Sequence, residues 1–161
     1  MSDTKSVSVS EIFSLQRPEQ KPRTKNQLWI KDVGYDEAPW YSERMGLLEL
    51  EDFLKVAGER IDYVKIATTQ VLGHPENWLK RKIALYQEHS IQPYLDHGYF
   101  LRAFRLGVVD EAIEAGAALG FSVMEFMNTF GDVPERQLRK WRSLARDCGM
   151  SLIYEHHPER G

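Results

Sequence analysis

Charged and polar side chains recur in this sequence where short apolar segments end. Lys65 is the most informative, because it lies within the alternating segment 62–66, and a buried lysine is costly unless it is paired or used. Comparable positions after other apolar segments are occupied by Asp32, Asp96, His97, Glu125, Asn128, Glu155 and His156. Carboxylates beside a lysine and a histidine could hold Mg²⁺ next to a cation that binds an anion. A lysine can also act as a general acid or base when burial lowers its pKa.

Most of these residues could instead have a purely structural role. Lys65 and Glu125 could form a structural ion pair inside the sheet, and Asp32 could only shape a turn. The range 96–98 could be a tight turn, and the histidines at 156–157 could be solvated. The sequence leaves these alternatives open. It contains no P-loop, GxGxxG, HExxH or CxxC pattern.

The apolar segments alternate with amphipathic ones, as in repeated βα units. Strands are predicted at 28–30, 63–66, 91–95, 121–126 and 150–154, and a polar turn at 67–70. Helices are predicted at 47–60, 75–89, 99–106, 109–119 and 134–148. The strands recur about every 30 residues, which is the length of a βαβ unit. This alternation predicts a parallel sheet with helices on its outside, whose strands bring their carboxyl ends to one edge.

The fold class predicted is α/β, with parallel (β/α) repeats of the TIM-barrel type forming an incomplete (β/α)₈ barrel. About five units are present, too few to close an eight-stranded barrel. The sheet is therefore open, or completed by dimerisation, or part of a longer chain. Because open edges favour pairing, a homo-oligomer is expected. The domain is predicted to span 27–161, preceded by a flexible arm at 1–26, which is polar throughout apart from one apolar cluster.

Composition limits the classes of partner. The chain has 161 residues, 42% hydrophobic and 28% charged, with a net charge of −3, which argues against a nucleic-acid binder. No apolar run approaches the roughly 20 residues of a membrane span, so no membrane partner is expected. Cys148 is the only cysteine, and the cytoplasm is the predicted location.

Several motifs resemble, in order and spacing, those of the phosphosulfolactate synthase family, which includes plant heat-stress-associated relatives. The helix and lysine strand at 48–65 look like the family's almost throughout. The range 79–91 resembles its L-x-x-K-I-x-x-Y-x-x-x-x-I helix, and 119–125 resembles its L-G-F-x-x-x-E strand. Shorter similarities lie at 30–34, 107–110 and 152–155.

The resemblance implies a (β/α)₈ barrel in which sulfite adds to phosphoenolpyruvate with the help of Mg²⁺. A small anionic substrate of this kind is the expected partner. The catalytic residues predicted on this basis are Lys65, Glu125 and Glu155. Lys65, His97 and Asn128 are predicted to bind the substrate, and Asp32, Glu125 and Glu155 to bind Mg²⁺.

The sequence departs from the family at three loops, and two further readings stay open. The family's K-F-G-W-G-T is replaced at 65–70, its P-G-G-T at 95–98, and its E-I-S-D-G at 125–129. Glycines that let a backbone approach a phosphate are missing from two of these loops. The same site could act on another small carboxylate. Alternatively, the chain could be a non-catalytic relative that acts through protein contacts.

Overall fold

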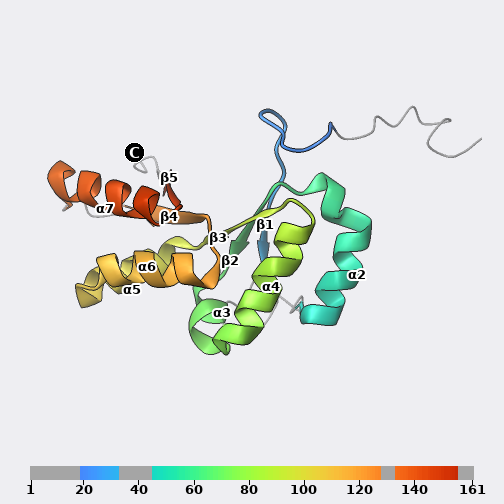
Figure 1. The fold of residues 1–161 in the computed structure, drawn as a ribbon, viewed down its shortest axis with the longest axis horizontal. Coiled ribbons are helices and arrows are strands. Elements are labelled where there is room, and N and C mark those ends of the chain that lie inside the picture. Colours follow the sequence, from blue (N-terminus) through green and yellow to red (C-terminus); the bar gives the residue numbers. More distant parts are fainter. Residues whose placement is uncertain (1–18, 33–44, 128–132, 156–161) are drawn as a thin grey trace, which may run out of the picture.

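Five parallel strands form one sheet in the order of the sequence. The computed structural model describes residues 19–32, 45–127 and 133–155. The strands are β1 (Trp29–Asp32), β2 (Tyr63–Ile66), β3 (Gln92–Leu95), β4 (Val123–Met127) and β5 (Ser151–Glu155). Because each strand pairs in parallel with the next along the chain, all their carboxyl ends lie at the same edge (Figure 1).

Helices connect the strands. They are α2 (Leu47–Ala57), α3 (Thr68–Gly73), α4 (Glu76–Glu88), α5 (His97–Leu106), α6 (Val109–Leu119) and α7 (Glu135–Asp147), and a 3₁₀ turn, η1 (Gly58–Arg60), follows α2. Helices α2 and α4 lie alongside each other, and α5, α6 and α7 form a second group (Figure 1). Gly107 and Gly120 end α5 and α6 in the left-handed conformation, which favours glycine. Within the described ranges, no helix combines the length and the apolar character needed to cross a membrane.

The predicted parallel α/β arrangement is confirmed, with one local correction. The segment after Lys65, predicted as a polar turn, forms the short helix α3. This helix has six residues, and its sequence is too short to show helical periodicity. Tertiary contacts stabilise this helix, because Gln70 and Val71 on it are buried.

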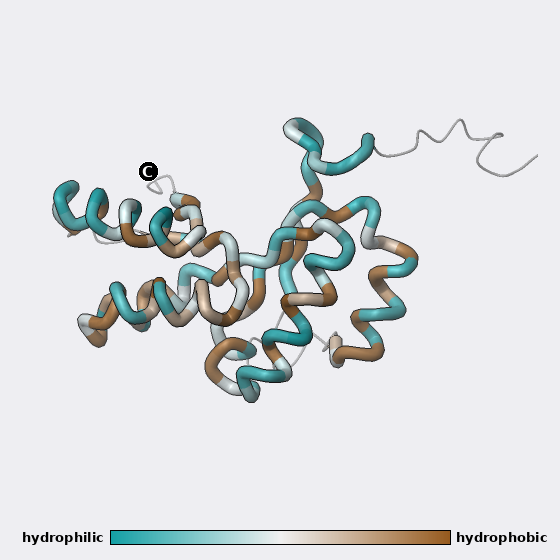
Figure 2. The backbone as a smooth tube through the Cα atoms, in the orientation of Figure 1, coloured by the Kyte–Doolittle hydropathy of each residue, from teal (hydrophilic) through white to brown (hydrophobic). Residues whose placement is uncertain are grey.

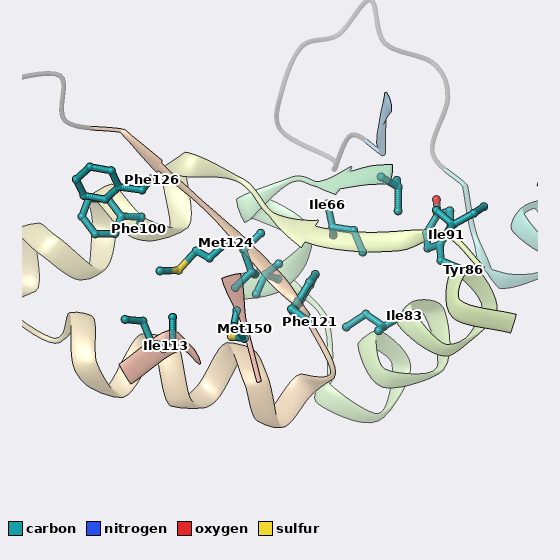
Figure 3. Close-up of a cluster of buried hydrophobic side chains, with 14 of the residues drawn as sticks. Ile66, Ile83, Tyr86, Ile91, Phe100, Ile113, Phe121, Met124, Phe126 and Met150 are labelled. Atoms are coloured by element: carbon teal, nitrogen blue, oxygen red, sulfur yellow. The ribbon is translucent and has the colours of Figure 1, made fainter. Parts of the chain in front are cut away.

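The hydrophobic core lies between the helices and one face of the sheet. Apolar residues recur among polar ones along α2 and α4, as expected of helices with one buried side (Figure 2). The strand residues in the core are Ile30, Val64, Ile66, Leu95, Met124, Phe126 and Leu152, which all share one face. Figure 3 shows Phe100 beside Phe126 at one end of this layer, with ring centroids 4.5 Å apart. Burying each such side chain contributes about 2 kcal/mol.

A buried polar network lies on this same helix-covered face. Asp32 is in register with Ile66, so its carboxylate points towards the helices. Its Oδ2 lies 2.6 Å from Lys82 Nζ and accepts a hydrogen bond of 2.7 Å from the Tyr86 hydroxyl. Gln70 donates from Nε2 to Asp32 Oδ1 at 2.7 Å and accepts from Lys82 Nζ at 2.7 Å. All four side chains are therefore satisfied inside the core.

Burial changes the titration of two members of this network. Desolvation lowers the pKa of Lys82, although the neighbouring Asp32 carboxylate opposes that change. Burial, and then the charge of Asp32, raises the pKa of the Tyr86 hydroxyl far above its usual value. Tyr86 therefore remains a hydrogen-bond donor to the carboxylate, and the Asp32–Lys82 pair is structural.

Residues 19–26, within the predicted N-terminal arm, contact the opposite end of the strands. Arg23 is 7% exposed, and its Nη2 lies 2.9 Å from Asp62 Oδ2. Lys21 Nζ donates to the carbonyls of Gly58 and His89 at 2.7 and 2.9 Å. The boundary at 26–27 remains a prediction, but these two side chains tie the segment to the start of β2 and the end of α4.

Replacing Asp32 by alanine should destabilise the protein by about 3–5 kcal/mol, because it leaves the Lys82 ammonium buried without its counter-ion. Urea unfolding of Asp32→Ala measures this loss. Asp52→Ala removes an exposed ion pair to Lys55 and is the matched control, expected within about 0.5 kcal/mol of wild type. The double variant Asp32→Ala with Lys82→Met should recover part of the loss. Equal effects at Asp32 and Asp52 would contradict the network's structural role.

Asp62 should make stability depend on pH in the acid range. Burial alone would raise the pKa of Asp62, but hydrogen bonds from Arg23 and the Leu28 amide outweigh it and lower that pKa below 3.8. The carboxylate therefore stabilises the fold above pH 3.8, and this contribution is lost as the pH falls through the folded-state pKa. Asp62→Asn should cost roughly 1–3 kcal/mol at pH 7.

Urea titrations of wild type and Asp62→Asn at several pH values test this dependence. The difference in unfolding free energy between the two proteins should shrink as the pH is lowered past 4 or so. A difference that stays constant down to pH 2 would show that Asp62 contributes packing rather than charge.

Candidate functional site

The second face of the sheet carries three of the charged residues that the sequence singles out, Lys65, Glu125 and Glu155. We call it the site face; it holds Lys31, Lys65, Tyr94, Glu125 and Glu155. The strand register places Lys31 opposite Lys65 and Lys65 opposite Tyr94. Glu125 follows Val123, the partner of Tyr94, by two residues, and Glu155 pairs with Met127. Period-two alternation along the strands therefore gathers these side chains on one side.

Three of these groups, Lys65, Glu125 and Glu155, are joined by direct contacts that include His97. Lys65 Nζ lies 2.7 Å from Glu125 Oε2. The backbone amide of His97, at the start of α5, donates to the same oxygen at 3.0 Å. His97 Nδ1 lies 3.1 Å from Glu125 Oε2 and 2.8 Å from Glu155 Oε2. Glu125 is thus held by an ammonium group and by a backbone amide at the start of a helix.

Asp96 adds a third carboxylate beside this group. Its Oδ1 accepts a hydrogen bond of 2.7 Å from the Gly98 amide, which caps α5, and one of 3.3 Å from the Thr68 hydroxyl. Its Oδ2 lies 3.5 Å from Lys31 Nζ. This oxygen is buried and accepts no hydrogen bond within the described part of the chain. It therefore has capacity for a further positive partner.

Tyr94 lies between these charges on the central strand. Burial, and then the carboxylates of Glu125, Asp96 and Glu155, raise the pKa of its hydroxyl well above the ordinary value. Lys65 Nζ is 5.8 Å from the centre of the Tyr94 ring, within range of a cation–π contact. At neutral pH, Tyr94 is therefore a neutral group that can donate a hydrogen bond.

The structure brings together four of the predicted site residues: Lys65, His97, Glu125 and Glu155. It does not bring Asp32 to them. Asp32 lies on the opposite face, because one residue of offset along a strand reverses the direction of a side chain. Asn128 and His156 lie outside the described residues.

Sequence reasoning assigned no role to three members of the site. Asp96 was considered at a strand end without a role, and Lys31 and Tyr94 were not singled out. The position of Lys31 in the strand could have identified it. Ile30 is apolar like Val64 of β2 and belongs to the core face, and since side chains alternate along a strand, Lys31 must lie on the face of Lys65.

Three of these residues could hold a metal ion. Asp96, His97 and Glu125 each offer one ligand atom, and these atoms lie within 4.8 Å of one another. Two carboxylates and an imidazole suit a divalent cation, and the buried Asp96 Oδ2 without a hydrogen bond supports such a fit. Glu155, whose Oε2 lies 2.8 Å from His97 Nδ1, could complete the set.

A parallel sheet whose strands follow one another in order, with its polar groups at the carboxyl ends, defines a protein of the (β/α)-repeat class. The model of the (2R)-phospho-3-sulfolactate synthase (ComA) family matches residues 16–161, and the chain belongs to this family. The predicted fold class, TIM-barrel-type repeats forming an incomplete barrel, is thereby confirmed, as is the family resemblance.

Two curated relatives extend this comparison. The chain is 28% identical to phosphosulfolactate synthase of Methanocaldococcus jannaschii over 106 residues, which cover 66% of this chain and 42% of the relative. It is 22% identical to phosphosulfolactate synthase of Methanothermobacter thermautotrophicus over 143 residues, covering 87% of this chain and 52% of the relative. The chain therefore spans about half the length of the curated relatives it matches.

Gly98→Ala should disturb the site through Asp96. A Cβ at position 98 would lie 2.8 Å from Thr68 Oγ1 and 3.1 Å from Asp96 Oδ1, so one of these groups must move. We expect a loss of about 1 kcal/mol in urea unfolding, the usual cost of weakening a helix cap. Gly73→Ala is the matched control, because nothing lies within 4 Å of its added Cβ. Adding Thr68→Ala to Gly98→Ala should restore part of the loss; no restoration would contradict the crowding.

Proposed function

We propose that this chain carries a phosphosulfolactate-synthase-type site, which adds sulfite to phosphoenolpyruvate or another nucleophile to a related small anionic carboxylate. The observation that carries the proposal is the run of contacts from Lys65 through Glu125 and His97 to Glu155, which come from four successive units. Family membership supports this reaction class, and the relatives named above share it.

The reaction requires a nucleophile, an electron sink and a proton. The sulfur of sulfite attacks the methylene carbon, and a carbon–sulfur bond forms as the carbon–carbon double bond opens. The electron pair moves to the carbon that bears the carboxylate, which then takes a proton. In the proposal, the Lys65 ammonium faces the anionic substrate and delivers this proton. Glu125 Oε2 lies 2.7 Å from this ammonium group in the structure.

The remaining side chains have positioning roles in this proposal. Asp96, His97, Glu125 and Glu155 would hold Mg²⁺, which stabilises the enolate-like charge when bound. Mg²⁺ prefers oxygen ligands, and three of these four residues supply carboxylate oxygens. Tyr94 can donate a hydrogen bond to an oxygen of the substrate, since its hydroxyl stays protonated. Asp32 is left out, because its oxygens are already bonded to Lys82, Tyr86 and Gln70.

A second candidate function is binding to another protein without catalysis. It is favoured by α3, which begins at Thr68 where the family has its glycine-rich loop after the lysine strand. A groove of about 250 Å³ between α3, α5 and α6 is also lined largely by apolar side chains. Leu72 and Leu106, both on this groove, are 52% and 66% exposed.

The proposal also includes the location and the oligomeric state of the protein. A cytoplasmic location agrees with a chain that has a single cysteine. Self-association is proposed because β1 and β5 each pair on one side only within the described residues.

Calorimetric titration of phosphoenolpyruvate, with and without Mg²⁺, tests the proposed function. Binding should require Mg²⁺ and weaken at least about tenfold in Lys65→Met, because removing a charged partner of a buried anion costs more than about 1.4 kcal/mol. Lys55→Met is the matched control, since Lys55 forms only an exposed pair with Asp52. Binding that meets these conditions leads to a direct assay of sulfite consumption. A folded wild type that binds no phosphoenolpyruvate would favour the second candidate.

A further inference from the structure

We propose that Lys31 and Lys65 exchange partners: each neutralises a carboxylate of the site in the metal-free protein and binds an anion once a divalent cation takes those carboxylates. This inference deepens the proposed function and rests on it for the identity of the substrate. It assigns a role to Lys31, and it predicts that metal and anion strengthen each other's binding.

The two lysines form a pair by their position. They lie opposite each other on neighbouring strands, and both side chains extend from the site face. The Lys31 side chain is 42% exposed, whereas that of Lys65 is 16% exposed. A lysine has a long flexible stem, so the more exposed Lys31 can reorient its ammonium group at little cost.

The carboxylates that these lysines contact are two of the candidate metal ligands. Lys65 Nζ lies 2.7 Å from Glu125 Oε2, and Lys31 Nζ lies 3.5 Å from Asp96 Oδ2. Asp96 and Glu125, with His97, are the three residues whose ligand atoms converge within 4.8 Å. An ammonium group and a metal ion would therefore compete for the same oxygens. The longer Lys31–Asp96 contact has no hydrogen bond at Asp96 Oδ2, so it is the easier one to exchange.

The charge of the site decides the direction of the exchange. Counted over these described residues alone, the three carboxylates of Asp96, Glu125 and Glu155 face two lysines, which leaves one net negative charge when His97 is neutral. By this count the metal-free group repels an anionic substrate. A divalent cation reverses that sign and draws Asp96 and Glu125 away from the two ammonium groups. The anion then binds a site of opposite charge.

Linkage makes the two binding events reciprocal. If a bound metal increases the affinity for an anion, the anion must increase the affinity for the metal by the same factor. Lys31 should affect the affinity for the metal and the affinity for the anion in opposite directions. Removing it relieves competition at Asp96, so the metal should bind more tightly, and it removes an anion contact, so the anion should bind more weakly. A residue that only supports the fold would weaken both when replaced.

Manganese binding to the full chain tests the exchange without any reaction. Free Mn²⁺ is measured by electron paramagnetic resonance as sulfate replaces chloride at constant ionic strength, and a titration without protein corrects for Mn²⁺–sulfate association. In wild type, saturating sulfate should tighten Mn²⁺ binding roughly fivefold or more. Lys31→Met should bind Mn²⁺ about twofold to fivefold more tightly without sulfate, and should lose most of the sulfate effect.

Three other variants control the result. Lys31→Arg keeps a cation and should retain part of the sulfate effect. Lys55→Met, which removes a lysine that is paired only with exposed Asp52, should behave as wild type. Lys31→Gln serves if Lys31→Met does not fold. The proposal is overturned if wild type binds no Mn²⁺, if sulfate leaves its Mn²⁺ affinity unchanged, or if Lys31→Met or Lys31→Gln binds Mn²⁺ more weakly than wild type.

Failure of this inference is distinguishable from failure of the proposed function. Coupling of Mn²⁺ and sulfate in a protein that does not bind phosphoenolpyruvate would support the exchange and contradict the proposed substrate. Conversely, phosphoenolpyruvate binding and sulfite consumption without that coupling would support the proposed function and overturn the exchange.

Discussion

The arrangement of this molecule depends on the alternation of side chains along five parallel, consecutively paired strands. Each strand offers one set of residues to the helices and the other set to the opposite face. Ile30, Val64 and Ile66 go to the core, whereas Lys31 and Lys65 go to the site face. Since the register is the same from β1 to β3, the charges on neighbouring strands gather instead of scattering. The core and the candidate site are therefore formed by alternate residues of the same strands.

The same alternation explains why two lysines of low exposure, Lys82 and Lys65, have different surroundings. Lys82, on the helix side, is fully enclosed and meets Asp32, Gln70 and the Met45 carbonyl. Because its side chain is 1% exposed and bonded to these partners, it supports the fold. Lys65 lies on the other face, where Glu125, His97 and Glu155 converge next to partly exposed groups. Low exposure alone does not distinguish Lys82 from Lys65, for which we propose a functional role, whereas the face of the sheet on which each ammonium group lies does.

Much of the fold could be predicted from the sequence, because period-two and helical periodicities are strong over these segments. The strand containing Lys65 and the helix ended by Gly120 are clear examples. The short helix α3 could not be predicted, since six residues carry too little periodicity and its stability depends on burial of Gln70 and Val71.

The site was predicted only in part, for a different physical reason. Lys65, His97, Glu125 and Glu155 could be grouped because all follow apolar segments of parallel strands. The grouping by strand end ignored which face each side chain takes, so it included Asp32 and omitted Lys31. Asp96 was a candidate but received no role, because a turn or helix cap already accounts for an aspartate at this position; the structure shows that one oxygen caps α5 through the Gly98 amide while the second faces Lys31.

The contacts of Lys82 also bear on how this scaffold can change. Its ammonium group binds Asp32, the last residue of β1, and the carbonyl of Met45, two residues before α2. One buried charge thus holds the end of β1 close to the start of α2. Because Lys82 holds both points, insertions or deletions between them need not alter the sheet, and the entropic cost of a longer connection grows slowly with its length. This makes the connection after β1 a natural place to graft new specificity onto the domain.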